Sequence, residues 1–336
     1  MSVVDPHMRV ERIAAGKLRR YHHLSLLRQL MWPKLVLLNL RDSLLVGVGF
    51  IQSFFKLIVW RPDVVFTKGG YVCLPVGMAA RVLRIPLVIH DSDAHPGLTN
   101  RVLSRWASAI ATGAPLEYYP YPKAISRYVG IPIREGFEPF TLAQRKKAKK
   151  QWGIDPERPL VVVTGGGLGA QRINDAVAGT LDELMEIASV VLISGSGQYD
   201  QLRALTPQYD ERYQLHAFVS EGLVSLFGAA DVVVTRAGMT TILELAALRK
   251  PTILVPNGKL TGGHQLKNAQ VYRDAKSVLI VDENTMEKTP LVLRDAVKTI
   301  LDDPKATDEM AERFMQFARP HAAKDVAEMI LGAISR

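Results

Sequence analysis

One stretch, residues 231–248, constrains the fold of this chain more than any other. It opens with an apolar run typical of a buried parallel strand, continues through a turn at Gly238, and closes in a helical pattern. Such a turn leaves free backbone N–H groups and the positive end of a helix dipole facing the crevice above the sheet, where phosphate binds. Glu244 lies in the first two turns of the predicted helix, where its carboxylate can accept two hydrogen bonds from a ribose. The pattern indicates a nucleoside diphosphate site; a tight strand–helix turn beside a solvated glutamate is the alternative.

The same alternation of apolar strand, polar or glycine-rich loop and helix continues along the chain. It predicts a parallel α/β sheet in each half. At 336 residues the chain is long enough for two domains. We place a first domain over 1–139, a second over 140–318, and within 319–336 a C-terminal helix that packs back on the first domain. The predicted strands are 64–66, 87–89, 109–112, 160–163, 190–193, 214–218, 231–234 and 252–256.

The net charge of +9 favours an anionic partner, either a phosphorylated substrate or an acidic membrane surface. Nucleic acid is not the expected partner, because aromatic residues make up only 7% of the chain and no zinc-finger spacing or RNA-recognition motif is present. A basic helix predicted at 142–152 is expected to be a solvated surface helix near the domain linker. With Cys73 as the single cysteine, an internal disulfide is excluded.

An apolar segment near the start of the chain allows three interpretations. Residues 43–60 contain one lysine among 18 residues, which is just long enough for a transmembrane helix. However, Gln52, Ser53 and Lys56 fall on one side at helical spacing, and residues 61–63 lead at once into a strand. This arrangement favours an amphipathic helix with a basic fringe, packed on the domain or resting on an anionic leaflet. A plain core helix is the third interpretation.

Two further loops follow predicted strands. The loop at 165–170 is rich in glycine, which allows a backbone to approach phosphate closely, but it lacks the Gly-Lys-Ser/Thr of a Walker motif. The loop at 90–97 carries His90, Asp91, Asp93 and His95 at the carboxyl end of a strand. Asp91 and Asp93 have the spacing of an Asp-x-Asp metal motif, but we expect no metal there because the context is not that of a metal site.

Several motifs in register resemble those of the MurG-type glycosyltransferases, glycosyltransferase family 28. The resemblance covers roughly residues 17–281 and rests on six pieces: KGGYV at 68–72, HDSD followed by GLTN at 90–100, GIPIR at 130–134, GGGLGA at 165–170, RAG with Thr241 and Glu244, and HQ followed by NA at 264–269. It implies a GT-B fold, in which two Rossmann-like domains face each other across a cleft. It also implies transfer of N-acetylglucosamine from its UDP donor to undecaprenyl-pyrophosphoryl-muramyl-pentapeptide, lipid I to lipid II, in peptidoglycan synthesis.

The resemblance also implies which residues meet the donor. Glu244 would take the ribose hydroxyls, and the two glycine-containing turns would hold the diphosphate or line the uridine pocket. Val219 would reach the uracil edge through its backbone, Arg134 would approach from the linker, and His264 with Gln265 would contact the sugar hydroxyls. Gly167 stands where many relatives have Ser, and Asp93 where many have Asn. The full donor set is Asp93, Arg134, Gly165, Gly166, Gly167, Val219, Gly238, Met239, Thr240, Thr241, Glu244, His264 and Gln265.

One family feature is missing from its expected place. The family begins with a strand and a Gly-Gly-Thr-Gly-Gly-His turn that contributes to acceptor binding and to the proposed catalytic base, and nothing before Lys17 supplies it. The sequence Thr-Gly-Gly-His at 261–264 is similar to part of this turn, but it lies in the second half of the chain and belongs to the donor loop. We therefore expect either a start assigned too late, or a partner-dependent or degraded version of the enzyme.

The implied chemistry is inverting transfer, which needs a base for the acceptor hydroxyl and positive potential for the leaving diphosphate. Asp91 and His95 are our candidate bases, and a polar loop that caps the next helix is the alternative. No cofactor or metal is expected beyond the donor substrate. The expected location is the cytoplasmic face of the cell membrane, as a peripheral protein that meets a polyprenyl-linked acceptor. A related lipid-acceptor transferase, a donor-binding subunit without activity, and a sugar-nucleotide epimerase of similar fold remain as alternatives.

Overall fold

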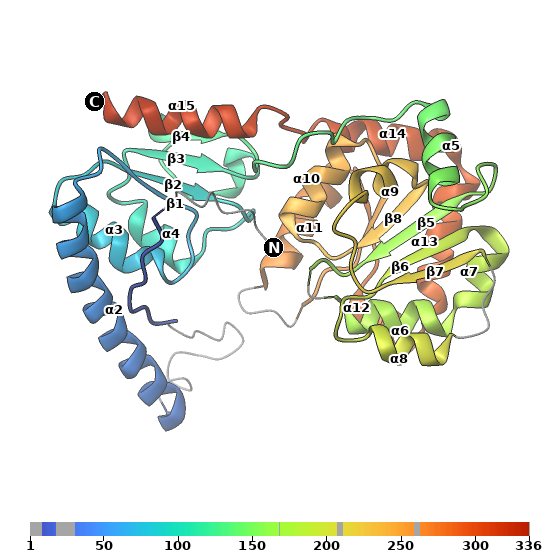
Figure 1. Cartoon of the computed structure of the whole chain (residues 1–336), viewed down its shortest axis with the longest axis horizontal. Coiled ribbons are helices and arrows are strands. Elements are labelled where there is room, and N and C mark those ends of the chain that lie inside the picture. Colours follow the sequence, from blue (N-terminus) through green and yellow to red (C-terminus); the bar gives the residue numbers. More distant parts are fainter. Residues whose placement is uncertain (1–8, 18–30, 168, 207–210, 259–262, 336) are drawn as a thin grey trace.

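A computed structural model describes residues 9–17, 31–167, 169–206, 211–258 and 263–335. These residues form two α/β domains that lie side by side, each built on a parallel sheet (Figure 1). Parts of three expectations lie outside the described residues: the first part of the apolar region, Leu168 in the glycine-rich loop, and Thr261 with Gly262 in the donor loop.

The first domain has a four-stranded parallel sheet in the order β1-β2-β3-β4. Its strands are β1 (Val65–Thr67), β2 (Leu87–Asp91), β3 (Ala109–Thr112) and β4 (Ser126–Tyr128). Its helices are α2 (Pro33–Trp60), α3 (Cys73–Val82) and α4 (Leu98–Leu103), with short 3-10 turns η1 (Leu116–Tyr118) and η2 (Lys123–Ile125). Every residue of β2 is buried, as expected for a parallel strand covered on both faces.

The second domain has a six-stranded parallel sheet in the order β10-β9-β8-β5-β6-β7. Its strands are β5 (Leu160–Thr164), β6 (Ser189–Ile193), β7 (Tyr213–His216), β8 (Val232–Thr235), β9 (Thr252–Leu254) and β10 (Leu279–Ile280). Its helices are α5 (Leu142–Gln151), α6 (Gln171–Gly179), α7 (Leu181–Ile187), α8 (Tyr199–Leu205), α9 (Leu223–Ala229), α10 (Met239–Ala247), α11 (His264–Asp274), α12 (Glu283–Lys288), α13 (Leu291–Asp302) and α14 (Pro304–Met315).

The strand order of the second domain contains a topological switch point. The chain runs outward from β5 through β6 to β7, then returns to the other side of β5 and runs outward again from β8 to β10. This is the doubly wound order, in which ligands bind beyond the carboxyl ends of the two central strands. Thr164 pairs with Thr235, so β5 and β8 end level with each other.

The chain ends on the first domain. Helix α15 (Ala322–Ile334) lies against that domain's sheet in Figure 1. Its Val326 is buried with Ala111 of β3 and Val129, and Asp325 forms an ion pair with Arg127 at 3.0 Å. The sheet is therefore covered by α15 on one face and by α3 and α4 on the other.

Helix α2 is the least embedded of the long helices. It begins with Pro33 in its first turn and ends at Trp60, and the C-cap residue Arg61 has a left-handed backbone with φ of 47°. Leu35 and Leu57 are buried, but a row of large apolar side chains is exposed, and the helix is long and apolar enough to cross a membrane. In Figure 1 its N-terminal end extends past the rest of the first domain. The segment 9–17 lies along it, where the Ala14 N–H donates to Oε1 of Gln52 at 2.7 Å.

Two local expectations are wrong. We expected β2 to end at residue 89, with His90 and Asp91 in the following loop, but both belong to the strand and are buried because they pair with Ala111 and Thr112 of β3. The helix α5 is also not wholly solvated: Lys149 is buried, and its ammonium donates to Oδ2 of Asp231 at 2.7 Å. The sequence pattern gave no sign of the short edge strands β4 and β10.

The glycine-rich loop after β5 yields a test of the fold. A Cβ at Gly165 would lie 2.2 Å from the backbone nitrogen of Ala170, whereas a Cβ at Gly167 meets nothing within 4 Å. We expect Gly165→Ala to lower the free energy of unfolding by about 1–3 kcal/mol, the usual cost of overpacking. Gly167→Ala is the matched control and should leave stability equal or higher by up to about 1 kcal/mol. Urea denaturation of both variants checks this; equal losses would contradict the packing argument.

Candidate functional site

The two glycine-containing turns lie together at the switch point of the second sheet. The loop at 165–167 follows β5, and the turn at Gly238 follows β8, its neighbour in the sheet. Gly166 has a φ of 78°, a left-handed conformation that favours glycine, and Gly166, Gly167 and Gly238 all face open space. The structure therefore brings two backbone turns to one point beyond the sheet.

Gly238 is the N-cap of α10, and no side chain caps this helix. The first backbone N–H groups of an α-helix have no partner within the helix, so those of Met239, Thr240 and Thr241 are available at this end. Together with the helix dipole they favour an anion. Beneath the turn, Arg236 is buried and its guanidinium donates to the Val255 carbonyl at 3.0 Å, which connects the end of β8 to the residue after β9.

Glu244 lies in the second turn of α10. Burial raises the pKa of its carboxyl to about 7, and the nearby charge of Arg134 acts in the opposite direction. Within the described residues no hydrogen bond or ion pair engages this carboxylate. Arg134 itself is exposed on the segment that links the domains. A half-buried carboxylate without a protein partner can accept hydrogen bonds from a bound hydroxyl pair.

The remaining donor-side residues lie around the same end of the sheet. Val219 is buried in the segment after β7, and His264 and Gln265 open α11 after the loop that follows β9. The Gln265 side chain already accepts a hydrogen bond at Oε1 from the Asn257 N–H at 2.8 Å. Its amide nitrogen is then the group that can reach a ligand.

A separate cavity of about 430 Å³ opens in the first domain. One wall is the turn after β1, which contains Lys68 and Gly69. The other runs from Asp91, the last residue of β2, to Arg101, and Lys17 lies at one side. His264 of the second domain also lines it. Three basic side chains, those of Lys17, Lys68 and Arg101, therefore surround a space large enough for part of a polar ligand.

Asp91 is the buried carboxylate of this cavity. The Tyr121 hydroxyl donates to its Oδ2 at 2.6 Å, and burial, the largest cause, raises the pKa of Asp91 to about 7. The hydrogen bond from Tyr121 favours the ionised form, but it does not offset the loss of solvation. A carboxyl group with a pKa near neutrality can both accept and release a proton under physiological conditions.

His95 is held differently. Its Nε2 lies 2.7 Å from Nη2 of Arg101. A guanidinium can only donate, so Nε2 must accept this hydrogen bond, and its lone pair is not available to take a proton. Of the two candidate bases, the geometry favours Asp91.

The loop after β2 also touches the second domain. Asp93 Oδ1 accepts a hydrogen bond from Nδ2 of Asn268 at 3.0 Å, and Asp93 Oδ2 lies 3.6 Å from Nδ1 of His264. Two predicted donor-side residues, Asp93 and His264, are therefore neighbours across the domain boundary. Among the described residues, no group of three or more His, Cys, Asp or Glu side chains is arranged to hold a metal ion.

The predicted residues fall into two groups. Asp91, Asp93, His95 and His264 line the first-domain cavity, whereas the glycine turns and Glu244 lie at the switch point and do not line it.

Sequence reasoning missed Tyr121 and the bridging contacts of Asn268. Tyr121 lies in a Tyr-Tyr-Pro-Tyr run with no recognisable pattern, while Asn268 stands in a quoted motif but without an assigned role.

Comparisons with known proteins agree with this architecture. Residues 7–112 match the glycosyltransferase family 28 N-terminal domain, and residues 160–326 match the glycosyltransferase family 28 C-terminal domain. The UDP-N-acetylglucosamine–N-acetylmuramyl-(pentapeptide) pyrophosphoryl-undecaprenol N-acetylglucosamine transferase of Lachnospira eligens is 34% identical, over 83% of this chain and 74% of its own length.

Solved structures agree with the predicted fold. The crystal structure of Acinetobacter baumannii MurG matches with a TM-score of 0.69 and 25% identity, over 87% of this chain and 79% of that one. A UDP-GlcNAc 2-epimerase from Neisseria meningitidis matches with a TM-score of 0.61 but only 12% identity, over 86% of this chain and 81% of that one, which shows the shared fold alone. The expected GT-B fold of two Rossmann-like domains is confirmed, and the chain belongs to glycosyltransferase family 28.

Proposed function

We propose that this chain transfers N-acetylglucosamine from UDP-N-acetylglucosamine to undecaprenyl-pyrophosphoryl-muramyl-pentapeptide. The observation that carries the proposal is the meeting of two backbone turns and Glu244 at the switch point of the second sheet, in a chain 34% identical to a transferase named for this reaction. The same reasoning makes UDP-N-acetylglucosamine the donor substrate and requires no further cofactor.

In this proposal the second domain holds the donor. The N–H groups at the start of α10 and in the loop after β5 bind the diphosphate, and Glu244 accepts hydrogen bonds from the ribose hydroxyls. His264 and Gln265 reach the sugar, and the Val219 backbone meets the uracil edge. As the glycosidic bond breaks, negative charge grows on the leaving UDP, and the helix dipole with Arg134 stabilises that charge.

The first domain takes the acceptor. Its cavity is lined by Lys17, Lys68 and Arg101, whose charges suit the pyrophosphate of a polyprenyl-linked sugar. Asp91 acts as the base: its carboxylate takes the proton of the acceptor hydroxyl while that oxygen forms a bond to the anomeric carbon and UDP departs with the bonding electrons. Tyr121 positions the carboxylate through its hydrogen bond.

Helix α2 provides the contact with the membrane. Its exposed row of Leu37, Leu40, Leu44, Val48, Ile51 and Phe55 recurs at three- and four-residue spacing, so it forms one apolar stripe along the helix. Lys34, Arg41 and Lys56 lie on the same helix, where Arg41 forms an ion pair with Asp42 and Lys56 forms one with Glu11. We infer that the protein is peripheral and rests this stripe on the anionic cytoplasmic leaflet, where the acceptor resides.

The direct test is transfer of labelled N-acetylglucosamine from UDP to the undecaprenyl muramyl-pentapeptide acceptor by this chain alone. Transfer to this acceptor supports the proposal. Transfer only to other polyprenyl or diacylglycerol acceptors would favour a related lipid-acceptor transferase. Binding of UDP-N-acetylglucosamine without any transfer would favour a donor-binding subunit and would contradict the proposal.

Glu244 offers a test of the donor site. Glu244→Gln should weaken UDP-N-acetylglucosamine binding by roughly 1–3 kcal/mol, the scale for hydrogen bonds to a charged group. Because the pKa of Glu244 is raised to about 7, donor affinity of the unaltered chain should fall as the pH drops below about 7, and Glu244→Gln should remove that dependence. Calorimetry between pH 6 and 8 measures both, with Glu138→Gln on the exposed linker as the control. An unchanged affinity would remove Glu244 from the site.

Asp91 offers a test of the base. With its pKa raised to about 7 in the free protein, the ionised form predominates only above that pH, so kcat/KM for the acceptor at saturating donor should rise with pH and reach half its plateau near pH 7. Asp91→Asn should lower kcat by about 10²- to 10⁴-fold, the typical contribution of a general base. Asp63→Asn, an exposed aspartate before β1, is the matched control. A variant Asp91→Asn with nearly full activity would show that the base lies elsewhere.

The membrane contact can be tested with vesicles. Leu44→Glu should weaken binding to vesicles rich in phosphatidylglycerol by roughly tenfold, about 1.4 kcal/mol, because a charge replaces buried apolar surface. Leu205→Glu is the control, since Leu205 is equally exposed but lies on α8 of the second domain. Binding of the unaltered chain should fall as salt rises. Salt-independent binding would instead indicate that α2 inserts across the bilayer.

A further inference from the structure

Glu283 is a buried carboxylate that belongs neither to the proposed donor site nor to the first-domain cavity. It lies in the first turn of α12 and is 4% exposed. Its Oε2 accepts a hydrogen bond from Nη1 of Arg172 at 3.0 Å, and its Oε1 lies 2.5 Å from Nη2 of Arg236. The side chains of both arginines are largely buried as well. One carboxylate therefore joins two guanidinium groups from distant parts of the chain.

The two arginines lie beside the turns that are proposed to hold the diphosphate. Arg172 is the second residue of α6, the helix that begins after the glycine-rich loop, and Arg236 directly follows β8 in the turn that leads to α10. Arg236 also donates to the carbonyl of Val255, the residue after β9. The chain segments that follow β5, β8 and β9 are therefore connected through Glu283.

The charges of this network suit the helix ends that it joins. A helix dipole is positive at the N-terminus, so Glu283 is favourable in the first turn of α12, whereas Arg172 is unfavourable in the first turn of α6. Their ion pair compensates for this, and α6 and α12 lie next to each other in Figure 1. Arg172 also pairs with the half-exposed Glu287 of α12, at 3.2 Å. Loss of Glu283 would leave two largely buried cations close together without their shared partner.

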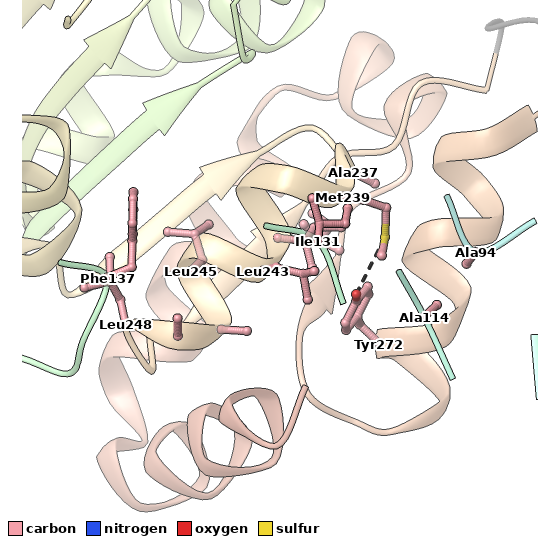
Figure 2. Close-up of a cluster of buried hydrophobic side chains, with 14 of the residues drawn as sticks. Ala94, Ala114, Ile131, Phe137, Ala237, Met239, Leu243, Leu245, Leu248 and Tyr272 are labelled. Atoms are coloured by element: carbon pink, nitrogen blue, oxygen red, sulfur yellow. Dashed lines mark hydrogen bonds between the residues drawn. The ribbon is translucent and has the colours of Figure 1, made fainter. Parts of the chain in front are cut away.

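The glycine-rich loop depends on such a network more than α10 does. In Figure 2, Met239 and Leu243 point from α10 into an apolar cluster, where the Met239 sulfur accepts a hydrogen bond from the Tyr272 hydroxyl at 3.6 Å. This packing holds α10, and with it Glu244. Residues 165–167 are all glycine and have no side chains to pack. The position of this loop relative to α10 is therefore set by its two flanking elements, β5 and α6.

We propose that Glu283 is a positioning residue: through Arg172 and Arg236 it fixes the spacing between the glycine-rich loop and the first turn of α10. The part concerning the donor rests on the proposed function, whereas the part concerning the two turns does not. Glu283 acts through its two arginines and not by contact with the donor.

Two substitutions with opposite electrostatic effects test this inference. Glu283→Gln removes a negative charge near the proposed diphosphate site, and Arg172→Met removes a positive one. A purely electrostatic role would make the first strengthen UDP binding and the second weaken it. Positioning instead predicts that each substitution raises the Kd for UDP by about fivefold or more, and that the double variant binds no more weakly than the weaker single variant, because both break one link. The Kd for uridine should stay within about twofold, because the apolar cluster holds Glu244.

The matched control is Asp231→Asn. Asp231 also holds two cationic side chains, those of Arg145 and Lys149, but it lies at the amino ends of the same two strands. Its Oδ2 accepts a hydrogen bond from the N–H of Leu160, the first residue of β5, at 2.8 Å. This variant should lower the melting temperature and leave the Kd for UDP within about twofold, because the turns lie at the other ends of the strands.

Hydrogen–deuterium exchange separates this inference from the proposed function. Glu283→Gln and Arg172→Met should speed exchange of the backbone amides of α6 and α12 relative to the rest of the second domain, and Asp231→Asn should not. The inference is overturned if Glu283→Gln binds UDP as tightly as the unaltered chain or more tightly, if the two losses are additive, or if the exchange does not change. If the unaltered chain does not bind UDP, the proposed donor site fails, and the exchange data alone decide on the two turns. If Glu283→Gln does not fold, the partly exposed Arg172→Met carries the exchange measurement.

Discussion

The parallel pairing of β5 with β8 is the constraint on which the rest of the site depends. Because Thr164 pairs with Thr235, the two strands end level, and the chain leaves them as two adjacent turns. The doubly wound order sends the following helices to opposite faces of the sheet, which opens a crevice between the turns. The N–H groups at the start of α10 then face this crevice, and Glu244 lies in the second turn of the same helix. Among the residues described, no other pair of neighbouring strands in this sheet lies at a reversal of the strand order.

The two domains use burial for different ends. In the second domain, partial burial raises the pKa of Glu244, and no described protein group forms a hydrogen bond with its carboxylate. The hydroxyls of a ligand can therefore supply these hydrogen bonds. In the first, deeper burial raises the pKa of Asp91, and Tyr121 fixes its direction. Burial raises the pKa of both carboxyl groups to about 7, and we propose that Glu244 governs donor affinity and Asp91 governs turnover. Hydrogen bonds of Asn268 connect the loop after β2 in the first domain with the turn before α10 in the second.

Features set by neighbours in the sequence could be predicted, and features set by distant segments could not. The turn at Gly238, the helix beginning at residue 239 and the C-terminal helix at 322–334 follow from local apolar period and glycine placement. The burial of Asp91 depends on its pairing with Thr112 and on Tyr121, 30 positions away, and the contact of Asn268 with Asp93 spans 175 positions. A local pattern carries no information on such pairings. The roles of the donor-side residues therefore stay predictions.

The most direct measurement is a crystal structure of this chain with UDP-N-acetylglucosamine. The account predicts the diphosphate between the loop after β5 and the N-terminus of α10, with both ribose hydroxyls within hydrogen-bond distance of the Glu244 carboxylate. A nucleotide bound in the first-domain cavity, or one whose ribose lies away from Glu244, would contradict the central claim that the switch point of the second sheet is the donor site.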